Sequence, residues 1–232
     1  MKNPIIISLG GSLIVPKKIG WEFLEQFKKV IEDQIKAERK FVIVAGGGNT
    51  ARRYQQAADK ITGLTKDDQD WLGIHATRLN AHLIKTIFRK HAHPRINKNP
   101  RTKEDLSQHF EAGESIMVAA GWRPGWSTDY VAAILAERLN AKEIVNLSNI
   151  ENVFDKDPKT NSDAVKYDKI DWKNFRKLVG NKWDPGLNTP FDPIASKHAQ
   201  KIGLKVFIIG GKNIENLEKF FAGEKYKGTE IG

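Results

Sequence analysis

Three apolar segments of this chain each end in a turn that contains glycine. The turns are Gly10-Gly11-Ser12, Gly46-Gly47-Gly48-Asn49 and Gly121 to Gly125. A strand that ends in glycines and leads into a helix presents free backbone N–H groups to an anion, and the missing Cβ lets phosphate oxygens approach the backbone. In an open parallel sheet all three turns lie at the carboxyl edge, where ligands bind. One such turn also serves as an ordinary tight turn, but three on one edge predict a site for several phosphates.

Apolar strands alternate with amphipathic helical patterns along the whole chain, which predicts an α/β fold with a largely parallel sheet. The expected strands are 5–9, 41–45, 115–119, 143–147, 205–209 and, at an edge of the sheet, 228–231. The expected helices are 21–38, a helix capped by Asn49 or Thr50 that runs to about 60, then 67–90, 104–110, 128–139, 171–179, 193–202 and 214–222. Residues 149–168 are expected to form a loop or hairpin, and residues 181–190 a loop.

The chain is basic, with a formal net charge of +10. Such a charge attracts either nucleic acid or small polyanions such as nucleotides. The basic residues are scattered, and the densest run, 91–103, contains Pro94 and Pro100, so a solvated surface segment is favoured over a nucleic-acid patch. The chain has no cysteine and no apolar stretch near the ~18 residues that cross a bilayer. We therefore predict a cytoplasmic protein that binds small anions and contacts neither nucleic acid nor membrane.

Several common nucleotide and hydrolase motifs are missing from the sequence. It has no G-x-x-x-x-G-K-[ST] and no G-x-G-x-x-G at its first helix, which excludes a P-loop and makes a Rossmann dinucleotide site improbable. It also has no zinc-ligand spacing and no G-x-S-x-G elbow. Phosphate binding must therefore use a different arrangement of glycine turns.

Six segments carry a more specific pattern, in order along the chain. They are Ile7 to Ser12, Ala45 to Arg52, Leu72 to Ala81, Pro124 to Asp129, Phe154 to Pro158 and Asp192 to Ala195. Together they resemble the amino acid kinase superfamily, with the archaeal-type uridylate kinase family nearest. This resemblance implies a three-layer αβα sandwich with a mainly parallel central sheet. It also implies one domain of two lobes, about 1–140 for the phosphate acceptor and about 141–232 for ATP.

The resemblance also implies a role for individual residues in transfer of the ATP γ-phosphate to UMP. The transferring phosphate would be held and organised by Gly10, Gly11, Ser12 and Asp129. UMP would be bound by Gly46, Gly47, Arg52, Asp70, Ser127 and Thr128. ATP would be bound by Ser8, Gly48, Asn149, Phe154 and Asp157. Magnesium would be held mainly by the nucleotide phosphates, without a protein cage, and the protein would form a homohexamer.

Ordinary structural roles compete with several of these assignments. Ser127 or Thr128 caps a helix in any case, and acidic residues such as Asp129 and Asp70 complement a helix dipole. By residue type alone, Arg52 fits a solvated position on a helix as well as it fits a phosphate ligand. The preceding glycine turn favours the phosphate ligand. Three tryptophans have two interpretations, a surface on which a nucleobase packs or part of a subunit interface. They are Trp122, Trp126 and Trp183.

The sequence departs from the family pattern at the expected centre of transfer. Many superfamily members carry a lysine in place of Ser8, and some carry another near Asp192; such lysines neutralise charge on the transferring group. We hypothesise that Arg52, Arg123 or Lys156 supplies that charge. Glu151-Asn152 replaces an Asp-Gly pair, and residues 183–188 do not resemble their counterpart. Two alternatives therefore stay open: a superfamily kinase for carbamate, acetylglutamate or isopentenyl phosphate, and a non-catalytic nucleotide-binding protein.

Overall fold

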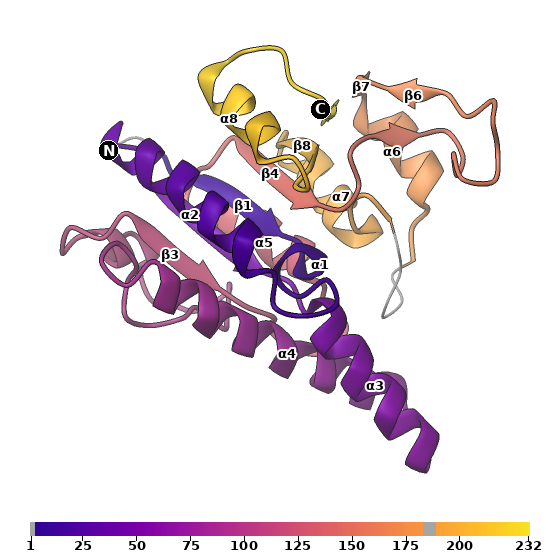
Figure 1. The fold of residues 1–232 in the computed structure, drawn as a ribbon, viewed down its shortest axis with the longest axis horizontal. Helices are drawn as coiled ribbons and strands as arrows, with labels where there is room; N and C mark the ends of the chain where they lie inside the picture. Colours follow the sequence, from indigo (N-terminus) through magenta and orange to yellow (C-terminus); the bar gives the residue numbers. More distant parts are fainter. Residues whose placement is uncertain (1–2, 183–188) are drawn as a thin grey trace.

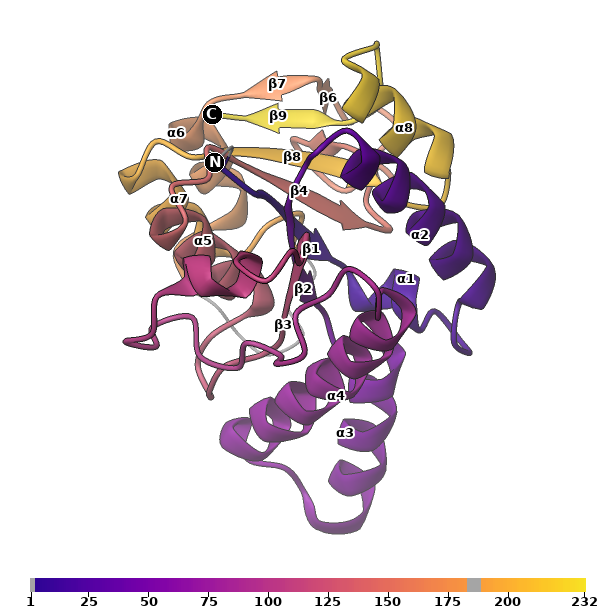
Figure 2. The same cartoon turned by 90° about the vertical axis from the view of Figure 1, so that its left-hand side faces the viewer.

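A twisted central sheet organises the molecule (Figures 1 and 2). The computed structural model describes residues 3–182 and 189–232, and within these ranges the sheet has seven strands in the order β3-β2-β1-β4-β8-β9-β7. The strands are β3 (Ile116–Ala119), β2 (Phe41–Ala45), β1 (Ile5–Leu9), β4 (Glu143–Ser148), β8 (Lys205–Gly210), β9 (Thr229–Ile231) and β7 (Lys169–Ile170). The first five are parallel, and β9 runs antiparallel to β8. The predicted α/β class with a mainly parallel sheet is confirmed.

The central strands are apolar on both faces because helices cover both faces. All five residues of β2 are buried, as expected for a parallel strand in the middle of such a sheet. β1 lies between β2 and β4, with Ser8 level with Val44 on one side and with Asn146 on the other. Ser8 and Asn146 are therefore polar side chains side by side near the carboxyl ends of two central strands.

Helices form a layer on each face of the sheet, which completes the expected three-layer sandwich (Figure 2). One face carries α5 (Thr128–Arg138), α6 (Trp172–Val179) and α7 (Pro193–Lys201). The other carries α1 (Gly11–Ile14), α2 (Trp21–Lys36), α4 (Lys66–Ile87) and α8 (Ile214–Ala222). α3 (Gly48–Thr62) packs against α4, and the two helices project beyond the end of the sheet (Figure 1).

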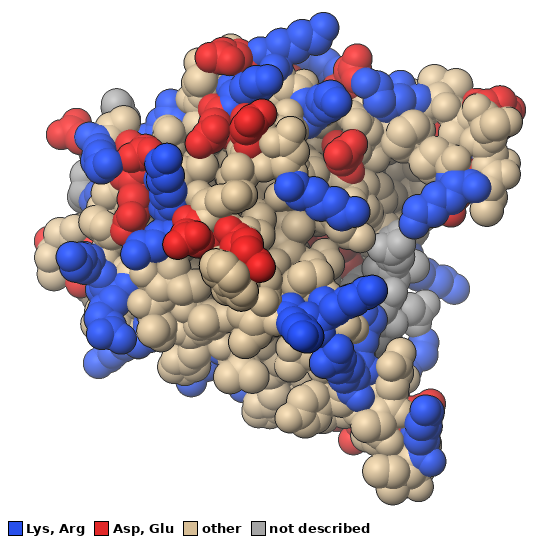
Figure 3. All heavy atoms as spheres, in the orientation of Figure 1, with Lys and Arg blue, Asp and Glu red and all other residues tan. Residues whose placement is uncertain are grey.

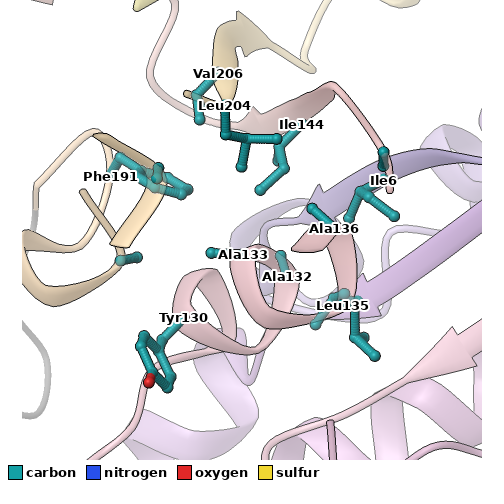
Figure 4. Packing of buried hydrophobic residues seen from close by; sticks show 14 of the residues in the cluster. Ile6, Tyr130, Ala132, Ala133, Leu135, Ala136, Ile144, Phe191, Leu204 and Val206 are labelled. Carbon is teal, nitrogen blue, oxygen red and sulfur yellow. The ribbon is translucent and has the colours of Figure 1, made fainter. Parts of the chain in front are cut away.

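Helix α5 is fixed against the centre of the sheet. Its residues from Tyr130 to Ala136 are all buried, and it contacts β1, β2 and β4. Figure 4 labels the short side chains of Ala132, Ala133 and Ala136 on α5 in the same apolar cluster as Ile6 of β1. The N-terminal end of α5, which holds Ser127 to Asp129, is consequently placed by core packing rather than by a loop.

The short elements are where the structure corrects the predictions. The helix after β2 was expected to be capped by Asn49 or Thr50, but α3 begins at Gly48 with Gly47 at its N-cap and no side-chain cap bond. The four-residue α1 and the two-residue β7 were not predicted. β7 pairs with β9, so β9 is not the edge strand it was expected to be.

Two further segments refine the predictions. Residues 149–168 form a hairpin of β5 (Val153–Phe154) and β6 (Lys166–Tyr167), one of the two forms expected. The short helix expected at 104–110 is a 3₁₀ helix over Leu106–Phe110. In α4 the buried face is formed largely by small and polar residues, and the large apolar side chains of Trp71 and Leu79 are 40% and 63% exposed. The two-lobe division near residue 140 stays a prediction.

Candidate active site

The glycine turns after β1 and β2 touch each other through their backbones. A Cβ added at Gly11 would lie 2.0 Å from the Gly48 nitrogen, and one added at Gly48 would lie 2.0 Å from the Gly11 carbonyl oxygen. A Cβ at Gly46 would lie 2.6 Å from the Gly11 nitrogen. Gly48 also has a φ of +61°, in the left-handed region that favours glycine. The expectation that these strand ends lie together at one edge of the sheet is therefore correct.

Helix α4 holds the glycine turns with two buried polar side chains. Thr77 Oγ1 accepts a hydrogen bond from the Gly121 amide at 2.8 Å and donates to the Ile74 carbonyl at 2.6 Å. Asn80 Nδ2 donates to the carbonyl oxygens of Gly46 and Gly47 at 2.7 and 3.1 Å. The third turn is thereby tied to the same site as the first two. Neither Thr77 nor Asn80 was assigned a role from the sequence.

A cavity of about 600 Å³ opens where these turns meet. All but two of the predicted site residues line it: Ser8, Gly10, Gly11, Ser12, Gly46, Gly47, Gly48, Arg52, Asp70, Ser127, Thr128, Asp129 and Asn149. Lining residues that the sequence analysis did not single out for this site include Gln55, Thr77, Asn146 and Ser148. Trp126, one of the tryptophans with two interpretations, lines the cavity too.

Asp129 stands at the centre of a polar network inside the cavity. Its Oδ1 accepts hydrogen bonds from Ser8 Oγ at 2.9 Å and Asn146 Nδ2 at 3.4 Å. Its Oδ2 accepts from the Asp192 backbone amide at 3.2 Å. Ser127 caps α5, because its Oγ accepts from the Tyr130 amide at 3.1 Å. The capping role considered for Ser127 is thus real, and the capping residue also faces the cavity.

Burial, and secondarily the negative charge of Asp192, raise the pKa of Asp129 to about 7. Asp192 is itself buried, and burial raises its pKa as well. Among the described residues that line the cavity, Arg52 is the only lysine or arginine, and it forms no ion pair with either carboxyl group. Asp129 therefore gains or loses its proton near neutral pH, beside a second carboxyl group whose pKa is also raised.

Replacing Asp129 with asparagine should change how stability depends on pH. Between about pH 4 and 7 folded Asp129 holds a proton that the unfolded chain releases, so its contribution to the free energy of unfolding falls as pH rises. The difference between Asp129→Asn and wild type should therefore shift in favour of the variant by about 3 kcal/mol from pH 4.5 to pH 8. Urea unfolding at both pH values measures this difference.

The exposed Asp33 provides a matched control for this measurement. Its pKa is lowered, first by a hydrogen bond from Lys36 and then by the charge of that lysine. Asp33→Asn should give almost no change in this difference between pH 4.5 and pH 8, because a carboxyl group with a lowered pKa is ionised in both the folded and the unfolded chain over most of this range. A pH-independent difference for Asp129→Asn would contradict the assigned environment of Asp129.

Asp70 connects α4 to the third glycine turn. Its Oδ2 accepts the Gly125 amide at 2.7 Å; burial raises its pKa, and this hydrogen bond opposes the rise. The N-terminus of α4 is capped elsewhere, by a reciprocal pair formed by Thr65 and Asp68. Asp70 is therefore not simply a helix-end charge, since it faces the cavity and holds the loop before Ser127.

Arg52 is the only lysine or arginine among the described residues that line the cavity. It is exposed on α3, and within residues 3–182 and 189–232 its guanidinium has no hydrogen-bond or ion-pair partner. The other two candidates for a compensating charge are engaged elsewhere. Arg123 lies 4.2 Å from the centre of the Trp122 ring, and Lys156 pairs with Asp163 at 2.6 Å. Neither of these two residues lines the cavity.

Comparison with known proteins agrees with this geometry. The family model described as "Amino acid kinase family" matches residues 3–210. The chain belongs to the amino acid kinase family. It is 32% identical to uridylate kinases of Hyperthermus butylicus, over 97% of this chain and 96% of that protein, and of Pyrococcus abyssi, over 98% of each. The crystal structure of uridylate kinase from Archaeoglobus fulgidus is 31% identical and superposes with a TM-score of 0.80 over 99% of this chain and 100% of that one.

Two residues assigned to ATP by the resemblance to the amino acid kinase family lie outside the cavity lining. Phe154 is in β5 and pairs with Lys166 of β6. Asp157 occupies the turn of this hairpin, where its Oδ1 accepts the Lys159 amide at 2.9 Å. Their role toward ATP stays a prediction. Asn149, assigned to ATP as well, does line the cavity and accepts a hydrogen bond from Ser12 Oγ at 3.3 Å.

Figure 3 shows lysine and arginine side chains spread over one face of the molecule, with aspartate and glutamate side chains among many of them. Within the part of the chain that the structure describes, three or more His, Cys, Asp or Glu side chains never gather in a metal-binding group. Helices long and apolar enough to cross a membrane are likewise not found among the described residues. Residues 183–188, which include Trp183 and do not resemble their counterpart in the family, lie outside the described residues.

Proposed function

We propose that this member of the amino acid kinase family transfers the γ-phosphate of ATP to UMP, giving UDP and ADP. The observation that carries the proposal is one cavity that is lined both by the two touching glycine turns and by Arg52 and Asp70. Relatives of this chain named uridylate kinase align with it over nearly the full length of both proteins. In the reaction a UMP phosphate oxygen bonds to the γ-phosphorus as the bond to the β–γ bridging oxygen breaks, and ADP leaves with that oxygen.

Arg52 and Asp70 form the acceptor half of the proposed site. A guanidinium can bind a phosphate through two parallel hydrogen bonds, and Arg52 has no competing partner within the described ranges. Gly47 of the second glycine turn lines the same space, whereas the Gly46 amide donates to the Leu9 carbonyl at 2.9 Å. Asp70 uses Oδ2 for the Gly125 amide, which leaves Oδ1 to accept hydrogen bonds from ribose hydroxyls.

The donor half is formed by the turn at Gly10, Gly11 and Ser12. The Gly10 amide donates to the Leu147 carbonyl at 2.8 Å, so the proposed cradle for the γ-phosphate uses the amides of Gly11 and Ser12, which line the cavity beside Gly48 and Ser8. Asn149, Phe154 and Asp157 are proposed to contact the sugar and base of ATP. Mg²⁺ held by the ATP phosphates would neutralise negative charge during transfer. Asp129, whose carboxyl oxygens bind Ser8, Asn146 and the Asp192 amide, is proposed to hold the groups around the transferring phosphate in place.

We further propose that the enzyme is cytoplasmic, forms a homohexamer and acts in pyrimidine biosynthesis. Large apolar side chains are exposed on the projecting pair of helices, Tyr54 and Ile61 on α3 and Trp71 and Leu79 on α4. Such surfaces are typical of protein–protein contacts and support self-association. Light scattering after size exclusion should give six times the chain mass of 26.2 kDa.

The decisive assay measures ADP formation with a panel of acceptors, with and without Mg²⁺. The panel contains UMP, CMP, carbamate, acetylglutamate and isopentenyl phosphate. UMP should give a kcat/KM at least about tenfold above any other acceptor. Arg52 and Asp70 match a phosphorylated ribose and so disfavour carbamate, acetylglutamate and isopentenyl phosphate, whereas CMP, which has the same phosphate and ribose, tests the choice of base. A preference for carbamate or isopentenyl phosphate would reassign the acceptor. ATP binding in calorimetry without UDP formation would point to a non-catalytic nucleotide-binding protein.

A further inference from the structure

A stack of aromatic rings runs from the cavity wall into the core. The Trp126 and Tyr130 ring centres are 4.2 Å apart and the planes are inclined by 26°. Tyr130 is buried, and its hydroxyl accepts a hydrogen bond from Arg101 at 2.8 Å. Its ring meets His198 edge-on, with the centres 5.8 Å apart. Trp126 is thus held against a ring that is itself fixed by α5 and α7.

Trp126 lies directly beside the proposed ribose contact. The Gly125 amide, one residue earlier, donates to Asp70 Oδ2 at 2.7 Å. Gly125 has a φ of +86° and an open environment at its Cα, so the chain turns sharply there before it reaches Trp126. Both Asp70 and Trp126 line the cavity, whereas the neighbouring Trp122 does not. The carboxyl group that is proposed to bind the ribose is therefore bonded to the residue that directly precedes Trp126, and both side chains line one cavity.

We infer that Trp126 is the surface on which the nucleobase of the acceptor nucleotide stacks, an inference that rests on the proposed nucleoside-monophosphate kinase activity. A nucleobase stacks on an indole ring through the π faces of both groups. Tyr130 behind Trp126 fixes the orientation of the indole before the nucleotide arrives, so that less rotational freedom is lost on binding. Arg52, Asp70 and Trp126 then contact phosphate, ribose and base in turn.

Binding of the base can be measured separately from binding of the phosphate and ribose by comparing UMP with ribose 5-phosphate. Ribose 5-phosphate retains the groups that Arg52 and Asp70 bind but has no base. Trp126→Leu should weaken UMP binding about tenfold, the loss expected for one stacked base, and leave ribose 5-phosphate binding unchanged. Calorimetry with each compound measures both affinities. In the coupled assay the KM for UMP should rise about tenfold while the KM for ATP stays constant.

Trp122→Leu is the matched control, because Trp122 packs 6.0 Å from Trp126 without lining the cavity. It should leave the affinities for UMP and ribose 5-phosphate unchanged. Equal losses for UMP and ribose 5-phosphate in Trp126→Leu would assign Trp126 a purely structural role. Unchanged UMP affinity in Trp126→Leu would place the base elsewhere. Both outcomes overturn the inference even if wild type makes UDP, whereas a wild type that makes no UDP would refute the proposed function itself.

A spectroscopic measurement provides a second test that does not depend on how well Trp126→Leu folds. UMP should quench the tryptophan fluorescence of the wild-type protein, and ribose 5-phosphate should not. Trp126→Phe keeps an aromatic ring at this position, so its UMP affinity should stay within about threefold of wild type, while the quenching should be lost. Quenching that persists in Trp126→Phe would overturn the inference, because it would come from a different tryptophan.

Discussion

Gly11→Ala is expected to lower the free energy of unfolding by about 3 kcal/mol or more and to abolish phosphoryl transfer. The added methyl group would lie 2.0 Å from the Gly48 nitrogen and 2.7 Å from the Gly46 carbonyl carbon. These neighbours are backbone atoms, so no side chain can rotate away. The turns after β1 and β2 must therefore separate, and the amides of the cradle move with them. Urea unfolding and the coupled assay with UMP measure the two effects.

Gly203→Ala provides a matched control, since it also adds one methyl group to a glycine. Gly203 has a φ of +65°, and its Cα has open space around it. The variant should lose only about 1 kcal/mol, the usual cost of a left-handed alanine, and keep its activity. If Gly11→Ala were as stable and active as Gly203→Ala, the backbone contact between the two turns would not exist in solution.

Arg52→Ala is expected to raise the KM for UMP by about 100-fold or more, since two charge-assisted hydrogen bonds to the phosphate would be lost. Stability should stay within about 0.5 kcal/mol of wild type, because Arg52 is exposed and has no partner in the described ranges. Arg52→Lys should restore part of the affinity, because lysine keeps the charge without the planar fork. Steady-state kinetics with varied UMP at saturating ATP measures the effect.

The neighbouring Arg53 separates a local contact from the general effect of charge. Its Nη2 donates to the Lys17 carbonyl at 2.7 Å, and it does not line the cavity. Arg53→Ala removes the same charge and should change the KM for UMP by less than about threefold. Similar increases in the KM for UMP in Arg52→Ala and Arg53→Ala would mean that the general positive charge of the surface attracts the acceptor phosphate, and that no guanidinium contacts it directly.

How much of the fold the sequence could predict depended on the length of each element. The bounds of β1, β2 and α8 agree with the prediction, because each carries an uninterrupted apolar run or several turns of helical periodicity. The two-residue β7 and four-residue α1 are too short to show any period, and they are formed through contacts with distant segments. The start of α3 was misplaced because Asn49 and Thr50 are good caps by residue type, whereas the glycine turn itself leads into the helix.

The parts of the candidate site that are formed by glycine turns could be predicted from the sequence. The side chains that support these turns from distant segments could not. Glycines after apolar strands predicted the contact between Gly11 and Gly48 at one edge of the sheet. Asn80 and Asn146 were not assigned roles, although polar residues at buried positions could have drawn attention to them. Their partners, the Gly46 carbonyl and Asp129, are 34 and 17 residues away along the chain. Sequence spacing alone does not reveal such pairings.

The contact between the turns after β1 and β2 limits how this enzyme could be redesigned. At Gly11, Gly46 and Gly48 the contact surface is main chain, and any added side chain meets a neighbour's backbone within 2.6 Å. An engineer seeking a new acceptor therefore has no tolerated substitution at these three positions and must vary the residues around them. Libraries at Arg52, Asp70 and Trp126 would sample new acceptors while the phosphate-transfer geometry stays intact.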